Sequence, residues 1–154
     1  MKKIILLSVC IVFAMASKAQ SNTDEITFMQ SVYGMQKKQL IEEHMKISEA
    51  QKAAFWKLYD EYETARKDLA KKRIDLLEKY ANNYDKMTNE FADKWASDVL
   101  SLTKQTDALV VTYYGKIKKV TNPVVALQFW QVEGYILSGI RLSLLESLPL
   151  PDLK

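Results

Sequence analysis

Cysteine and histidine are nearly absent from this 154-residue sequence, which has only Cys10 and His44. One thiol and one imidazole leave almost no material for Cys-His or Ser-His-Asp catalysis or for a zinc hydrolase. Glu42 and Glu43, next to His44, do not share its helical face in a metal-ligand spacing. We therefore expect His44 to be an ordinary surface residue, and the protein to have no metal, no cofactor and no enzymatic activity.

Glycine and proline are also scarce, with four and three residues respectively. The sequence has no glycine-rich loop of the kind that cradles phosphate groups. Valine, isoleucine and threonine do not alternate with polar residues, so β-strands have little support. The composition therefore indicates an all-α fold.

The first nineteen residues have the three parts of a secretory signal peptide. Lys2 and Lys3 form the basic part, the run 4–15 is apolar, and small residues follow it. The apolar run, about a dozen residues long, is too short to span a bilayer. Cleavage after Ala16 or after Ala19 satisfies the small-x-small rule, and we favour the second site. We therefore predict a signal peptide over 1–19 and a periplasmic location.

Removal of the signal peptide changes the chemistry of the remaining chain. It takes away three of the 22 basic residues and no acidic one, which leaves 19 basic against 19 acidic side chains. A neutral chain lacks the positive charge on which nucleic-acid binding depends, so we expect no nucleic-acid partner. Cys10 is removed as well, which excludes disulfide and thiol chemistry. A lipid anchor on Cys10 is not expected, because Val9 precedes it where a small residue is usual.

Residues 20–154 are enough for a single helical domain. Capping residues and apolar positions at three-and-four spacing predict four helices, over about 24–45, 49–83, 89–121 and 123–147. The second of these helices needs another beside it because of its length, so we expect long antiparallel hairpins.

Three helix starts carry clear capping signals. Ser48 and Gln51 have the spacing of a capping box. Thr88 precedes an acidic first turn, and Asn122-Pro123 combines an N-cap with proline at the first helical position. Gly34 weakens the middle of the first helix, where we expect a break or bend.

The predicted fourth helix is apolar nearly all round. Glu133, Arg141 and Glu146 are its only charged residues. Such a helix is normally buried on more than one face, but its charges and glutamines make a membrane span a poor interpretation. Its excess apolar surface favours a subunit interface or a binding groove, with Trp130 among the candidate contact residues.

Two arginines lie where the second helix should be apolar. Counted at about 100° per residue from Phe55, Arg66 and Arg73 fall at about 20° and 0°, within the apolar stripe. A buried unpaired charge is costly, so each needs a partner or a path to solvent. One interpretation, which we favour, is a structural salt bridge, with Glu133 as one candidate partner. The other is an open concave surface that binds client segments, with tyrosines such as Tyr59, Tyr62 and Tyr80 beside the guanidinium groups.

Carboxylates are frequent on the second helix. Asp60, Glu61 and Glu63 cluster there, interleaved with basic side chains such as Lys57 and Lys67. Mixed charges of this kind are typical of a solvated, ion-paired helix face. We expect these carboxylates to be exposed.

Several short segments resemble one protein family. Ile47-Ser48-Glu49-Ala50-Gln51 resembles the Leu-Thr-x-x-Gln signature of the Spy/CpxP-like periplasmic proteins, at the capped start of a long helix. The segment 87–91 resembles the second copy of that signature, with Phe91 in place of glutamine. The segments 55–63 and 129–133 are similar to small exported relatives of Bacteroidetes type. In this resemblance, Ile47, Ser48 and Gln51 have a structural capping role.

The resemblance implies a cradle-shaped, four-helix antiparallel homodimer. It implies either binding of unfolded or partly folded protein clients without ATP, or reporting of envelope stress to a membrane sensor. We expect the client or partner contacts to involve Arg66, Arg73, Tyr59, Tyr62 and Trp130. A second hypothesis is a structural or regulatory subunit that docks on one envelope protein through its fourth helix. Some relatives sense metals through histidine-rich sites, which this sequence lacks.

Overall fold

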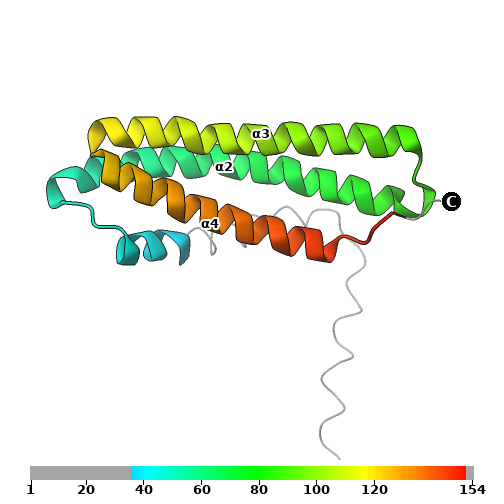
Figure 1. Ribbon diagram of the computed structural model, residues 1–154, viewed down its shortest axis with the longest axis horizontal. Coiled ribbons are helices and arrows are strands. Elements are labelled where there is room, and N and C mark those ends of the chain that lie inside the picture. The colour runs from blue at the N-terminus through cyan, green and yellow to red at the C-terminus, as the bar shows by residue number, and fades with distance from the viewer. Residues whose placement is uncertain (1–35, 152–154) are drawn as a thin grey trace, which may run out of the picture. The chain divides into compact units, whose positions relative to one another are not determined.

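The computed structural model describes residues 36–151, and the regular structure within that range is helical (Figure 1). Three long helices follow one another along the chain: α2 (Glu49–Asn83), α3 (Asn89–Val120) and α4 (Pro123–Ser147). A shorter helical segment, 36–44, precedes α2, and a 3₁₀ turn, η1 (Tyr84–Lys86), joins α2 to α3. The expected all-α fold with four helices and a long antiparallel hairpin is confirmed.

The described bundle belongs to one of two units into which the chain divides, Met1–Gln36 and Lys37–Lys154. The signal peptide predicted over 1–19 lies outside the described residues, as do most of the helix predicted over 24–45 and its bend at Gly34. The described part of that helix ends at His44.

Two helix starts use the side-chain caps that the sequence indicates. Thr88 accepts a hydrogen bond from the backbone N–H of Phe91 at 3.1 Å. Asn122 accepts hydrogen bonds from the N–H groups of Val124 and Val125 at 2.9 and 3.0 Å. These bonds satisfy N–H groups that the first turn of a helix leaves without an intrahelical partner.

The start of α2 differs from the prediction. Ser48 is the N-cap residue, but its hydroxyl donates to Oε1 of Gln51 at 2.9 Å, and no side chain caps the helix. The two side chains of the predicted capping box therefore bind each other instead of the backbone. The position of the helix start was correct and its side-chain mechanism was wrong.

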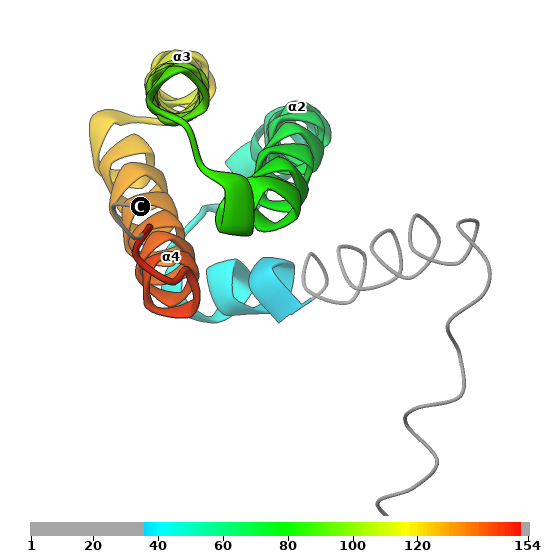
Figure 2. The same ribbon diagram turned by 90° about the vertical axis from the view of Figure 1, so that its right-hand side faces the viewer.

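The three long helices form a bundle in which α3 runs antiparallel to both α2 and α4 (Figures 1 and 2). Viewed along the bundle, they occupy three corners, and the segment 36–44 lies at the side between α2 and α4 (Figure 2). Ile41 of that segment is fully buried against the core. The segment thus supplies part of a fourth side to one half of the bundle.

Aromatic side chains from all three long helices form the core of this half. The Tyr62 ring on α2 lies 5.2 Å from Phe129 on α4 and 5.5 Å from Tyr113 on α3, edge to face in both pairs. Tyr59 packs edge to face on Phe129 at 6.4 Å. Burial of side chains of this size contributes roughly 1.5–3 kcal/mol each, so this cluster fixes the three helices together.

Hydrogen bonds hold the other half of the bundle. Trp95 on α3 donates its Nε1–H to the carbonyl oxygen of Leu76 on α2 at 2.7 Å. The hydroxyl of Tyr80 donates to the carbonyl oxygen of Pro149 at 2.7 Å, beyond the end of α4. The side chains there fill the interior less completely, and the cavities described below lie between these helices.

Candidate binding site

A network of buried charges joins the segment 36–44 to α2 and α4. Lys37 Nζ lies 2.6 Å from Glu63 Oε1 and 2.7 Å from Glu133 Oε2. Arg66 donates to both oxygens of Glu63, at 2.9 and 3.0 Å, and the hydroxyl of Tyr62 donates to Glu133 Oε2 at 2.7 Å. These five residues, here called the buried charge cluster, are each less than one-tenth exposed. Two cations face two carboxylates, so the cluster is balanced when all four are ionised.

The two carboxyl groups of the cluster titrate in opposite directions. Burial alone would raise the pKa of Glu63, but hydrogen bonds and charges from Arg66 and Lys37 outweigh it and hold that pKa below its usual value. Burial raises the pKa of Glu133, and Lys37 and Tyr62 offset this only in part. Burial also raises the pKa of the Tyr62 hydroxyl, and the negative charge of Glu133 adds to the effect. Glu133 is therefore the group in the cluster whose charge is least well compensated.

The cluster corrects two expectations drawn from the sequence. Glu63 is buried, whereas its charged neighbours Asp60 and Glu61 are exposed as expected. Arg66 forms the expected structural salt bridge, but its partner is Glu63, three residues away, and not Glu133. Glu133 pairs with Lys37 instead, a residue that the sequence analysis did not single out.

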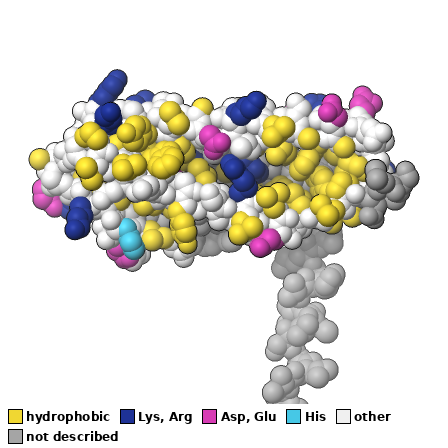
Figure 3. All heavy atoms as spheres, in the orientation of Figure 1, with side chains coloured by type: hydrophobic (Ala, Val, Ile, Leu, Met, Phe, Trp, Pro, Cys, Tyr) yellow, Lys and Arg dark blue, Asp and Glu magenta, His cyan; other side chains and the backbone are white. Residues whose placement is uncertain are grey.

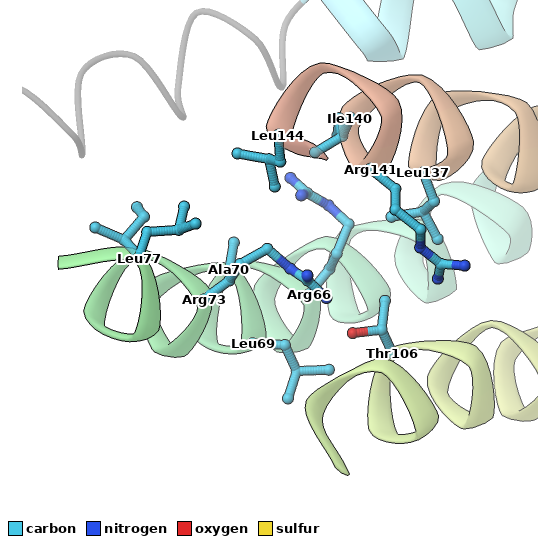
Figure 4. Close-up of a pocket in the computed structure, with 11 residues that line it drawn as sticks. Arg66, Leu69, Ala70, Arg73, Leu77, Thr106, Leu137, Ile140, Arg141 and Leu144 are labelled. Atoms are coloured by element: carbon cyan, nitrogen blue, oxygen red, sulfur yellow. The ribbon is translucent and has the colours of Figure 1, made fainter. Parts of the chain in front are cut away.

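A cavity of about 220 Å³ opens between α2 and α4, beside the buried charge cluster (Figure 4). Its walls are mostly aliphatic, from leucine, isoleucine and alanine side chains, with one hydroxyl from Thr106 of α3. Three arginines, Arg66, Arg73 and Arg141, also line it, and none of the lining residues within 36–151 is a carboxylate. We call this space the arginine cavity.

The three arginines of the cavity differ in how their charges are compensated. Arg66 is paired with Glu63, as described above. Arg141 lies 3.7 Å from Asp107, in a pair whose side chains are both about half exposed. Among residues 36–151, no carboxylate forms an ion pair with Arg73. Burial lowers the pKa of Arg73, the charge of Arg141 lowers it further, and Asp107 opposes them.

Two further cavities continue from the arginine cavity toward the end of α4. The first, of about 130 Å³, shares Arg73, Leu77, Arg141 and Leu144 with it. The second, of about 320 Å³, shares Trp95, Leu145 and Leu148 with the first, and its lining residues in the described part of the chain are uncharged. The positive charge thus lies at one end of this series, and the far end is apolar.

The outward face of α4 carries several large apolar side chains, with the exposed polar residues Gln131 and Ser138 between them. Val124, Leu127, Tyr135, Leu142 and Leu145 are each between 46% and 83% exposed. At 100° per residue they fall within about 80° of one another around the helix. We call these five residues the outer stripe. Hydrophobic side chains gather in two areas of the face in Figure 3, with Lys or Arg side chains between them.

The residues that the sequence analysis proposed for client contact fall in different environments. Tyr59 and Tyr62 are fully buried in the core, and Arg66 is in the buried charge cluster. Arg73 is half-buried at the arginine cavity, and Trp130 is 49% exposed on α4, next to the outer stripe. The structure therefore brings Arg66 and Arg73 to the arginine cavity and Trp130 to the surface.

The residues of the capping signature lie at the start of α2. Ile47 is half-buried and packs against the core, while Ser48 and Gln51 bind each other as described. His44 is exposed, and its Nδ1 lies 3.0 Å from the carbonyl oxygen of Leu40. Within the described range, no group of three or more His, Cys, Asp or Glu side chains is arranged to hold a metal ion. None of the helices in that range is long and apolar enough to cross a membrane.

Comparison of the chain with protein-family models, with curated proteins and with solved structures gave no match. The resemblance to the Spy/CpxP-like family stays a prediction from short motifs.

Proposed function

We propose that this protein is an exported, non-catalytic binding protein that holds apolar segments of unfolded or partly folded proteins without ATP. The outer stripe of α4 carries this proposal, because it presents five large apolar side chains on one exposed helix face. Large apolar side chains exposed along one helix face mark a binding site for another protein. The resemblance to the Spy/CpxP-like family, which implies the same activity, supports the proposal.

The remaining candidate residues take different parts in this proposal. Trp130 extends the outer stripe and adds a large amphipathic ring, a side chain enriched at protein interfaces. Tyr59 and Tyr62 act from inside the bundle, by holding α4 against α2, and Arg66 pairs with Glu63 within α2. Because the predicted mature chain has equal numbers of acidic and basic residues, clients are held chiefly by apolar contact.

An aggregation assay with several unrelated unfolding proteins tests the proposal. The protein should suppress aggregation at near-stoichiometric ratios, and the double variant Leu127→Ser, Leu142→Ser should lose most of this protection. Leu100→Ser with Val111→Ser is the matched control, since both residues are 62% exposed but lie on α3. Absence of protection, or equal loss in the two double variants, would contradict the proposal.

The second candidate function is a structural or regulatory subunit that docks on one envelope protein. The outer stripe favours it too, because apolar side chains spaced along one face of α4 suit one complementary partner helix. Co-purification from the native envelope separates the two functions. One stoichiometric partner, lost in the Leu127→Ser, Leu142→Ser variant and accompanied by inactivity on unrelated clients, supports docking over client holding.

A second copy of this chain is a competing occupant of the outer stripe. The resemblance implies a homodimer, and an exposed apolar face offers a surface for one. Sedimentation at several concentrations measures the mass in solution. A mass of two chains that falls to one in the Leu127→Ser, Leu142→Ser variant assigns the stripe to the dimer. A mass of one chain at every concentration means that the outer stripe is free to bind clients.

A further inference from the structure

The arginine cavity holds positive charge that the described residues do not fully compensate. Among the carboxylates of residues 36–151, none forms an ion pair with Arg73, and only Asp107 pairs with Arg141, at 3.7 Å. Both guanidinium groups border one aliphatic space (Figure 4). Guanidinium groups bind carboxylates through paired charge-assisted hydrogen bonds, so two of them in a mostly apolar space favour an anionic group there.

The two adjoining cavities are apolar, in contrast to the positively charged arginine cavity. Their walls come from Leu76, Val99, Trp95, Phe91 and neighbouring apolar side chains. Of the described residues in these two linings, only Arg73 and Arg141 are charged, and both also line the arginine cavity. The polarity of the series matches a molecule with an anionic head and one long apolar tail.

We infer that these three cavities bind a single-chain fatty acid. Its carboxylate is held by Arg73 and Arg141, and its acyl chain lies along Leu144 and Trp95 toward Pro149. This site goes beyond the proposed client binding, because it lies between the helices. Leu145 is the one residue of the outer stripe among the described residues that line it, and Leu127 and Leu142, which test client binding, do not line it.

An acyl chain fits this space better than a polypeptide segment does. Every residue of a peptide brings an N–H and a C=O that need partners when they are buried. The walls of the arginine cavity and the one next to it offer the hydroxyls of Thr106 and Thr103, and Thr106 already donates to the carbonyl oxygen of Leu102. An acyl chain has no polar group to satisfy.

Trp95 allows the binding to be measured in the full chain. It lines both apolar cavities, and the protein has only two other tryptophans, Trp56 and Trp130. The variant Trp56→Phe, Trp130→Phe leaves Trp95 as the sole tryptophan. Titration with dibrominated stearate, a short-range quencher, should give saturable loss of its fluorescence below the micelle concentration. The brominated alcohol of the same chain length should bind at least about tenfold more weakly, since it lacks the charge.

Two substitutions in the same background complete the test. Arg73→Met should weaken stearate binding about tenfold or more. Lys72→Met removes a positive charge from an exposed neighbour and should leave binding unchanged. Far-ultraviolet circular dichroism checks that both variants stay folded. No saturable quenching, equal binding of acid and alcohol, or equal affinity of the two variants would overturn the inference, and none of these results bears on client protection by the outer stripe.

Discussion

The Nζ of Lys37 lies 2.6 Å from Oε1 of Glu63, although 26 residues separate them in sequence. The same ammonium group reaches Glu133 on α4, and Lys37 itself is only 2% exposed. One buried cation therefore connects three separate parts of the chain. Buried ion pairs add little net stability over apolar residues, but removing one partner leaves a buried charge uncompensated.

Lys37→Met should destabilise the protein by about 3–5 kcal/mol, because it leaves Glu63 and Glu133 as neighbouring buried carboxylates. Urea unfolding measures the change. Lys38→Met is the matched control, since Lys38 forms an exposed 3.4 Å pair with Asp60 and its loss should cost less than about 1 kcal/mol. Equal losses in the two variants would show that the buried pairing does not exist.

Arg66→Met and Arg73→Met should change the stability of the protein by different amounts, or in opposite directions, although both remove an arginine from one face of α2. Arg66 makes two hydrogen bonds to Glu63, so its loss should cost about 1.5–3 kcal/mol. Arg73 is half-buried, and the positive charge of Arg141 repels it. Loss of Arg73 should therefore leave the stability unchanged or raise it. Thermal unfolding of both variants decides this, and the reverse order would contradict the assigned pairing.

The pH dependence of stability should separate the two carboxylates. The pKa of Glu63 is lower in the folded protein than its usual 4.5, so its stabilisation is present above pH 4.5 and is lost as the pH falls through the folded pKa. The pKa of Glu133 is raised above 4.5, so the folded state takes up its proton first and gains stability as the pH falls toward 4.5.

The variants Glu63→Gln and Glu133→Gln allow the opposite pH dependences of the two carboxylates to be measured. The stability advantage of the wild type over Glu63→Gln should shrink as the pH falls below 4.5. The stability of the wild type relative to Glu133→Gln should rise as the pH falls from neutral to 4.5. Urea unfolding at a series of pH values gives both curves, and slopes of the same sign would refute the opposite pKa shifts.

The ends of the long helices could be predicted from the sequence because local side chains set them. Thr88 and Asn122 cap α3 and α4 as expected, and Pro123 occupies the first position of α4. The end of α3 differs by one residue, at Val120. The side-chain pairing of Ser48 with Gln51 was missed, because the spacing of a capping box does not say which hydrogen bond forms.

The caps themselves give a matched pair of substitutions. Asn122→Ala removes two hydrogen bonds to backbone N–H groups at the start of α4 and should cost about 0.5–2 kcal/mol. Ser48→Ala removes only a bond to the Gln51 side chain and should cost less. Thermal unfolding compares them, and an equal or larger loss for Ser48→Ala would support a working cap there.

The buried charge cluster could not be predicted, because its pairs depend on the rotation of helices that are far apart in sequence. Lys37 and Glu133 are 96 residues apart. The available signals were Glu133 within an apolar helix and Lys37 four residues before Ile41, on the face that becomes buried. Neither signal indicates which residue pairs with Lys37 or with Glu133.

The cavities were also beyond prediction, because they depend on how completely facing side chains fill the space between helices. The excess apolar surface of α4, in contrast, follows from its composition. Val125 and Phe129 are buried, while Leu127 and Leu145 on another side are exposed. Composition predicts two apolar faces and leaves open what covers the second one.

Site-specific photo-cross-linking tests the central claim, binding through the outer stripe, most directly. A photoreactive amino acid replaces Leu142 in one variant and Leu100 of α3, similarly exposed, in another. Each is illuminated with a chemically unfolded client. The account predicts strong cross-linking to the client from position 142 and little from position 100. Equal yields from the two positions, or no client adduct at 142, would contradict it.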